Sequence, residues 1–331
     1  MRTNARRFSA LALLCLLAAF LVAWSAGHQW AAPTDLWRAL TGANDAWSRL
    51  LIEWRLPRVL AAGMIGALLG LGGAIFQGVF RNPLAEPYLL GSAGGAAVGA
   101  TVALLVPLAL PMEFTLPVLS FVGAWGATWL VLAIARSAGV TDAAGLLLAG
   151  VALAAALSAA RSFLMLSLSD ETVSLQIVLS WLLGGVQTPD WSGLAWLTGL
   201  TGLCLALALT LSKGLDRLGL GEAMATSFGM NVERFIAWAV LVGALIVAVA
   251  VAHGGLVAFV GLIAPHIARW WLGPRHAAVL PASAIIGAAL VLLADGAARA
   301  VLPPGEVPLG LVTALIGAPF FLFLLARLVR R

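Results

Sequence analysis

The sequence predicts an all-α integral membrane protein of about ten transmembrane helices, with both termini in the cytoplasm. Three observations predict this fold class: 62% of the 331 residues are hydrophobic, only 10% are charged, and the mean hydropathy is +1.03. Soluble domains carry about 25% charged residues, so this chain has too few polar side chains to cover a large core in water. A transmembrane β-barrel would instead show alternating apolar and polar residues.

Ten apolar runs match the length of a bilayer crossing, which takes about 17–25 residues. The eighth run is short and rich in glycine and proline, so part of it is expected to be irregular or buried by neighbours. No change of composition divides the chain, and residues 1–331 are expected to form one transmembrane domain. The runs are Phe8–Gly27, Val59–Phe80, Tyr88–Met112, Phe114–Ala135, Ala143–Ser169, Trp191–Ser212, Phe235–Ala252, Gly254–Ala268, Ala277–Ala294 and Val307–Ala326.

Two apolar segments need separate interpretation. The first run follows Arg2, Arg6 and Arg7, as in a signal peptide. Its apolar length of about 20 residues exceeds the usual 7–15 of a signal-peptide core, so we expect a retained helix. The uncharged stretch Thr172–Gln187 is interpreted as a short surface helix, with a re-entrant helix as the alternative.

Glycines recur three or four residues apart in the second and third runs. This spacing places them on one helix face, where they permit close approach of another backbone. Tight helix packing is the main interpretation, and a pathway lined by backbone is the alternative. The glycines are Gly63, Gly66, Gly70, Gly73, Gly91, Gly95 and Gly99.

The charged residues distinguish the two sides of the membrane. With the N-terminus inside and ten spans, 13 lysines and arginines fall on the cytoplasmic side and five outside, as the positive-inside rule requires. The excess of 19 basic over 14 acidic residues is therefore a signal of topology. Because these charges are scattered between apolar runs, we exclude nucleic acid as a partner.

The sequence lacks the patterns of nucleotide hydrolysis, metal binding and ion coupling. Its only lysine, Lys213, lies outside any G-x-x-x-x-G-K-[ST] motif, which excludes a P-loop ATPase. The histidines form no ligand cluster, and Cys15 and Cys204 are expected to be inert buried thiols, so we predict no metal site, cofactor or catalytic residue. No carboxylate pair lies inside a span, which argues against an ion-coupled carrier. The energy for transport is then expected from another chain.

Four motifs in order carry a resemblance to a known family. They are Arg81–Pro87 with Gly91, Gly255–His266, Pro308–Gly310 and Gly317–Phe320. Together they resemble the permease family of type II ABC importers, which take up iron-siderophores, haem and cobalamin, over nearly the whole chain. We expect His266 to have a structural or capping role. The family-motif residues are Asn82, Pro83, Leu84, Ala85, Pro87, Gly91, Gly261, Pro265 and His266.

The resemblance implies a non-enzymatic transport subunit in the bacterial inner membrane. It implies a permease homodimer surrounded by membrane lipid, two subunits that use ATP and Mg, and a periplasmic binding protein that delivers a metal chelate. A ferric siderophore is the expected cargo; cobalamin or haem is the alternative, and an ion-coupled secondary transporter is the more distant one. Ser180–Gly185 slightly resembles cobalamin permeases, whereas Tyr88, the only tyrosine, gives haem ligation little support.

The cytoplasmic loop 213–234 resembles the family's coupling segment, two short helices around a glycine. Its apolar side chains outside a span suit a groove on a partner, although an amphipathic loop packed on its own bundle would show the same pattern. Gly229 suits a left-handed helix end. The residues assigned to coupling are Gly221, Glu222, Ala225, Phe228, Gly229, Met230, Val232 and Arg234.

Four arginines outside this loop are further candidates. Arg55, Arg58 and Arg299 match family arginines that pair with glutamates of the binding protein, a contact that suits the planar guanidinium. From the residues alone, anchoring of the chain at the membrane surface is the favoured interpretation, and the resemblance reverses this in favour of docking. Arg161 is the one charge well inside a run; it either faces the translocation pathway or reaches a carbonyl at the outer end.

Overall fold

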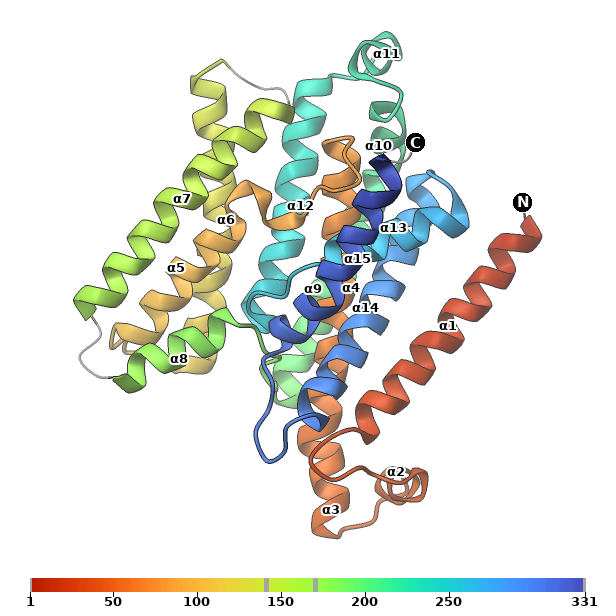
Figure 1. The fold of residues 1–331 in the computed structure, drawn as a ribbon, viewed down its shortest axis with the longest axis vertical. Coiled ribbons are helices and arrows are strands. Elements are labelled where there is room, and N and C mark those ends of the chain that lie inside the picture. The colour runs from red at the N-terminus through yellow and green to blue at the C-terminus, as the bar shows by residue number, and fades with distance from the viewer. Residues whose placement is uncertain (1, 140–142, 169–171, 330–331) are drawn as a thin grey trace.

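The computed structural model describes residues 2–139, 143–168 and 172–329, and every regular element within these ranges is a helix. Figure 1 shows the helices running roughly side by side between two ends of the molecule. In chain order the elements are α1 (Arg2–Ser25), α2 (Pro33–Leu40), α3 (Ala46–Arg49), the π-helix η1 (Leu50–Arg55), α4 (Leu56–Val79), the 3₁₀ helix η2 (Pro87–Leu90), α5 (Ser92–Leu105), α6 (Met112–Ser137), α7 (Ala143–Leu168), α8 (Thr172–Leu182), α9 (Trp191–Thr210), α10 (Ser212–Leu218), α11 (Glu222–Ser227), α12 (Val232–Gly254), α13 (Val260–Leu272), α14 (His276–Ala300) and α15 (Leu309–Val329).

Each predicted run contains a helix, but the helices differ in length. Six in the described ranges are long and apolar enough to cross a membrane, the first being a continuous helix over Ala46–Val79. The helices of the first, third, eighth and tenth runs are shorter in their apolar part, and crossing by these four stays a prediction. The other five long helices are Met112–Ser137, Gly145–Leu168, Trp191–Thr210, Val232–Gly254 and His276–Ala300.

Two predicted runs have different bounds in the structure. The third was expected to be helical over Tyr88–Met112, but its α-helix covers only Ser92–Leu105 because Gly91 is left-handed, with φ 76°. The eighth run was expected to be partly irregular, and it is: the backbone turns at Gly255, with φ 62°, and Phe259, with φ 66°, and α13 begins only at Val260. Both runs place irregular backbone next to long helices.

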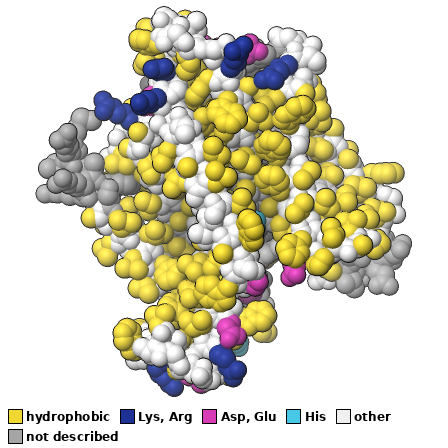
Figure 2. Space-filling model, turned by 180° about the vertical axis from the view of Figure 1, so that it is seen from behind, with side chains coloured by type: hydrophobic (Ala, Val, Ile, Leu, Met, Phe, Trp, Pro, Cys, Tyr) yellow, Lys and Arg dark blue, Asp and Glu magenta, His cyan; other side chains and the backbone are white. Residues whose placement is uncertain are grey.

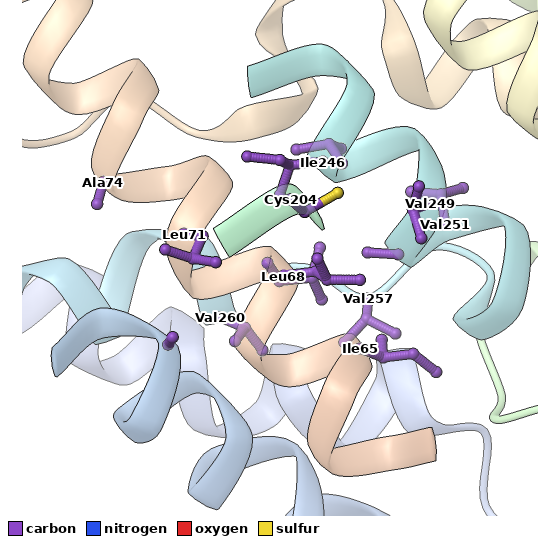
Figure 3. Packing of buried hydrophobic residues seen from close by; sticks show 14 of the residues in the cluster. Ile65, Leu68, Leu71, Ala74, Cys204, Ile246, Val249, Val251, Val257 and Val260 are labelled. Carbon is purple, nitrogen blue, oxygen red and sulfur yellow. The ribbon is translucent and has the colours of Figure 1, made fainter. Parts of the chain in front are cut away.

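Helix α4 is at the centre of the bundle and packs against α12, α13 and α14. Figure 3 shows its buried Ile65, Leu68 and Leu71 lying among valines and isoleucines of α12 and the segment that follows it. Three of the glycines predicted to form a contact face do so: a Cβ at any of them would overlap a carbonyl oxygen of a neighbouring helix. The pairs are Gly66 with Gly287, Gly70 with Ser283, and Gly73 with Gly261.

Helices α5, α6 and α7 form a second group beside this centre (Figure 1). Gly95 and Gly99 of α5 meet the backbone of α6 at Gly123 and Leu119, so the predicted close approach is found here too. Gly91 lies before α5 and is not part of this face. Cys204 is buried as expected, whereas Cys15 is exposed on α1 and corrects the prediction of a buried thiol.

Irregular backbone from distant parts of the chain meets in what we call the backbone junction, residues 183–187, 253–259 and 308–310. The amides of Leu309 and Gly310 donate to the carbonyls of Gly184 and Leu183, both at 3.0 Å. The amides of Gly185 and Gln187 donate to Gly254 and His253 at 3.0 and 3.1 Å. In addition, the Tyr88 hydroxyl bonds the backbone of Val257, and the Glu86 carboxylate accepts from the Phe259 amide at 2.9 Å. Non-helical backbone buried within the bundle thus has hydrogen-bond partners.

The two ends of the bundle differ in their elements. Helices α10 and α11 cap one end, at which α1 begins and α15 ends, and α2 and α3 lie at the opposite end (Figure 1). Figure 2 shows hydrophobic side chains in a broad band between two ends where lysines and arginines gather. We call these the α10–α11 end and the α2–α3 end.

Candidate functional site

The segment predicted to couple, residues 213–234, forms two short helices at the α10–α11 end. Helix α10 is followed by Gly219 and Gly221, the latter with φ 104°, and then by α11. Gly229 has φ 77° just beyond α11, so it ends this helix in the left-handed conformation that the sequence predicts. Asn231 then caps α12 by accepting from the Arg234 amide at 3.0 Å. Two tight glycine turns therefore set the outline of the segment.

The inner face of this segment is fixed to the bundle. Leu215, Leu218 and Ala225 are fully buried. The Asp216 carboxylate accepts from the backbone amide of His276 at 2.8 Å and lies 2.7 Å from Nδ1 of the same residue. These contacts connect α10 directly to the start of α14.

A salt bridge and an apolar surface define the outer face. Arg81, just after α4, pairs with Glu222 at 2.9 Å. Leu220, Met224 and Phe228 expose more than half of their surfaces, and we call them the apolar ridge. Of the other residues assigned to coupling, Met230 and Val232 are half-buried and Arg234 is exposed. The segment thus presents apolar side chains from a base held by one salt bridge and by hydrogen bonds to the start of α14.

The three candidate docking arginines lie together at the α2–α3 end, but in different environments. Arg58 donates to Asp295 Oδ1 at 3.1 Å and to both carboxylate oxygens of Glu306, at 3.0 and 2.8 Å; its side chain is 17% exposed. Arg55 stacks over the Trp47 ring, 5.2 Å from its centroid, and donates to the carbonyl of Ser25. Both guanidinium groups therefore lie near the surface with acceptors already around them.

Arg299 does not lie on the outer surface where the sequence analysis placed it. Its side chain is only 6% exposed. It donates to the carbonyls of Ala23 and Ala26 at 2.7 and 2.6 Å, and to Asp295 Oδ2 at 3.0 Å. It therefore satisfies carbonyl groups at the end of α1, as basic side chains do at helix C-termini. This position corrects the expectation of an accessible guanidinium.

Sequence reasoning missed the carboxylates of this cluster. Asp295 is fully buried between Arg58 and Arg299, and Glu306 comes from the loop between α14 and α15. The spacing of four between Asp295 and Arg299 is a helix-face signal that could have identified their pair. Nothing local connects Arg58 with Glu306, because the two are 248 residues apart.

Arg161 lies on α7, a helix that packs against α5. Ala154 and Leu157, which precede it at helical spacing, approach Gly94 of α5. The Arg161 side chain is half-buried, and its Nε atom is enclosed without a hydrogen-bond partner. A buried guanidinium nitrogen without an acceptor is costly, so this residue is not explained by packing within the described chain.

The family-motif residues lie where helices break or cross. Asn82 accepts from the Leu84 amide at 2.9 Å and Ala85 is fully buried, in the turn that leads from α4 to η2. Pro265 is inside α13, and Gly261 receives the close approach of Gly73. His266 has its ring edge-on to Trp270 and Phe320, at centroid distances of 4.7 and 6.0 Å, which fits the structural role expected for it. The backbone of Pro87 begins η2, and its side chain is not among those that the structure describes.

Comparison with known proteins gives consistent matches over most of the chain. The model of the FecCD transport family matches residues 14–327. The chain is 38% identical to the Fe(3+) dicitrate transport system permease protein FecD of Escherichia coli, with 88% of this chain and 91% of that protein covered. It is 36% identical to the hemin transport system permease protein HmuU of Yersinia pestis, with 88% and 87% covered.

Two further matches extend over nearly the full length. The chain is 37% identical to the vitamin B12 import system permease protein BtuC of Salmonella typhi, with 99% of this chain and 97% of that protein covered. A solved structure of a metal-chelate type ABC transporter in an inward-facing conformation superimposes with a TM-score of 0.84 at 30% identity. That alignment covers 96% of this chain and 97% of the other.

Proposed function

Because this chain belongs to the FecCD transport family, whose members are permeases of ABC importers for metal chelates, haem or cobalamin, we propose that it carries a ferric siderophore into the cytoplasm by alternating access. The match over residues 14–327 supports the importer role, and the siderophore is the proposed cargo within it. The relatives carry different cargoes by name, so haem and cobalamin are the alternatives within the family. The chain provides the path, and ATP hydrolysis belongs to a partner.

The α10–α11 end is proposed to face the cytoplasm and contact the ATP-hydrolysing subunits. The apolar ridge supports this role because exposed Leu220, Met224 and Phe228 suit a groove on a partner. The bonds from Asp216 to His276 and from Arg81 to Glu222 would pass movement of the segment to α14 and α4. Rigid anchoring on one face and apolar exposure on the other suit a part that transmits force.

The α2–α3 end is proposed to receive the periplasmic binding protein. Arg58 and Arg55 are the proposed contacts with its carboxylates, and Arg299 is proposed to act indirectly by holding Asp295 beneath Arg58. Replacing Arg58 by Gln is expected to weaken binding-protein affinity, whereas Arg38→Gln, an exposed arginine on the same end, is the control. Equal affinities of both variants and the parent would contradict the docking role.

Two copies of the chain are proposed to enclose the cargo path, with α7 and Arg161 at its border. The enclosed, unpartnered Nε of Arg161 supports a role with an acceptor that comes from outside the chain, an anionic chelate or the second copy. Arg161→Gln should lower uptake of an anionic chelate more than that of a neutral one. An equal effect on both would leave a structural role only.

Reconstitution tests the proposal as a whole. The chain, its cognate ATPase and the binding protein in sealed vesicles should take up the chelate only when ATP is supplied to the ATPase side. Uptake that persists without the ATPase and is abolished by an uncoupler would instead indicate an ion-coupled carrier. The cargo itself is identified by purifying the cognate binding protein with its native ligand and measuring the spectrum and mass of that ligand.

A further inference from the structure

A basic cavity lies at the α10–α11 end, where residues of the coupling segment form part of its lining. Its volume is about 750 Å³, and it is enclosed by the end of α4, by α10, by the end of α13 and by the start of α14. We propose that this cavity binds the phosphate-bearing headgroup of an anionic lipid. The charged residues of its lining are Arg81, Arg269, Arg275, His276 and Asp216.

The balance of charge in the cavity favours an anion. Three arginines face one carboxylate of the lining, Asp216, which already accepts from the His276 amide. Arg81 is paired with Glu222 and Arg269 donates to Gln77, so these two guanidinium groups are held in place. A positive charge remains after both carboxylates are counted. Planar guanidinium groups with several donors are well suited to phosphate oxygens.

Arg275 is the guanidinium most available to a ligand. It is exposed, it precedes the first residue of α14, and among the described residues it makes no ion pair. Arg275 is the N-cap residue of α14, but its side chain makes no capping hydrogen bond. The side chain can therefore turn to an incoming anion without giving up a contact that the fold requires.

Neighbouring tryptophans place the cavity at the surface of a membrane and favour a lipid over a free phosphate. Trp270 and Trp271 follow Arg269 directly and are 49% and 58% exposed at the end of α13. Tryptophans of this kind mark the headgroup level of a bilayer. Basic pockets between helices at the cytoplasmic surface match anionic headgroups. Leu215 and Pro83 add apolar lining suited to the glycerol region.

A headgroup bound here would connect the coupling segment with the bundle. The cavity is formed by α10 on one side and by α13 and α14 on the other. An anion between Arg275 and Arg81 would link the start of α14 to the coupling segment through Glu222 of α11, with which Arg81 pairs. This inference uses the proposed cytoplasmic placement of the end but not the identity of the cargo, so it can fail or hold independently of the transport proposal.

The test measures lipid retention by the intact chain. Native mass spectrometry of protein from nanodiscs should show retained phosphatidylglycerol in preference to phosphatidylcholine. Arg275→Gln should weaken this retention about fivefold, as expected for one cationic side chain near anionic lipid, and Arg275→Glu should abolish it. The matched control is Arg136→Gln, an exposed arginine at the end of α6 that does not line the cavity. Equal melting temperatures of all variants show that folding is intact.

The remaining outcomes separate the sources of the anion. The proposal is overturned if both lipids are retained equally, or if Arg136→Gln loses as much bound phosphatidylglycerol as Arg275→Gln. Inorganic phosphate could raise the melting temperature of the parent but not of Arg275→Gln, with neither lipid preferred. That result overturns the lipid proposal and leaves a site for a soluble phosphate. Displacement of phosphatidylglycerol by added ATPase subunit also overturns it, because the cavity would then belong to the subunit interface.

Discussion

At the scale of single residues, the buried Asp295 determines how two arginines are arranged. It lies between Arg58 and Arg299, and together they join α1, α4 and α14 at the α2–α3 end. A buried carboxylate is tolerated because both of its oxygens accept hydrogen bonds from guanidinium groups. Removing it would leave Arg299 buried without a counter-charge.

Asp295→Ala should therefore lower the free energy of unfolding by about 3–5 kcal/mol, the range found when one partner of a buried ion pair is removed. Glu306→Ala is the control, since Glu306 is half-exposed on the rim of the same cluster and should cost at most about 1 kcal/mol. Denaturant titration of both variants in detergent measures the difference. Similar losses for the two would show that Asp295 is not the central charge.

A second residue-scale prediction concerns Asp190, the N-cap of α9. The Ser192 hydroxyl and then the Gly193 amide donate to its carboxylate, both at 2.7 Å, and these bonds hold the pKa of Asp190 below its ordinary 3.8. Because the folded pKa is lowered, the stabilisation is fully present above the ordinary value and is lost as pH falls through the lowered one.

Asp190→Ala should accordingly melt at a lower temperature than the parent at neutral pH, and the gap should narrow below about pH 4. Asp190→Asn keeps a capping oxygen but cannot titrate, so its difference from Asp190→Ala should not change with pH. Melting curves between about pH 7 and pH 3 give the comparison. A gap between parent and Asp190→Ala that stays constant with pH would contradict the assigned bonds.

At the scale of elements, glycine spacing predicted close helix contacts but not their partners. Gly66, Gly70 and Gly73 recur on one face of α4, and the structure shows them against α13 and α14. Gly63 belongs to the same spacing but meets only the end of Leu292 at 3.7 Å, an ordinary contact. Spacing identifies a face, whereas the depth of contact depends on where distant helices cross it.

Gly73→Ala should therefore destabilise the chain by about 1–3 kcal/mol, since its Cβ would overlap the Gly261 carbonyl oxygen and force α4 and α13 apart. Gly63→Ala on the same helix is the matched control and should be neutral or slightly stabilising, because alanine favours helix. Thermal unfolding in detergent measures both. If the control loses as much stability, backbone crowding is not the cause.

The limits of sequence reasoning are clearest where a single apolar run contains both irregular backbone and a helix. The run over Tyr88–Met112 is apolar throughout, which predicts a span-length helix, yet left-handed Gly91 precedes a shorter one. In Gly254–Ala268 the glycines predicted irregular backbone, but not the left-handed Phe259 at which it ends. Hydropathy reports burial and not backbone direction, so it cannot distinguish these cases. The coupling segment was easier to predict, since its two helices and glycine turns are encoded locally.

At the scale of the whole molecule, the apolar ridge is an exposed part of the α10–α11 end that a partner can reach. Phe228 is 57% exposed and lies outside the hydrophobic core. Replacing it with Ala should lower ATPase-subunit affinity about tenfold without affecting folding, as for an aromatic residue at an interface centre.

Leu110→Ala is the control for this prediction because Leu110 is 69% exposed but lies in the loop between α5 and α6. Affinity for the ATPase and the melting temperature are measured for both variants. Unchanged affinity in Phe228→Ala would remove the ridge from the coupling contact. A loss of ATPase affinity in both variants would point to a general effect of lowered surface hydrophobicity.

The backbone junction has a mechanical consequence. Two amides at the start of α15 bond carbonyls that follow α8, and two amides after α8 bond the end of α12. Within a bilayer no water can replace these bonds, so separating the segments would leave unpaired groups at a high cost. The end of α8, the turn after α12 and the start of α15 should therefore move as one rigid unit. Movement of α10 and α12 would therefore carry all three segments together. Bending should occur where these segments join the rest of the chain.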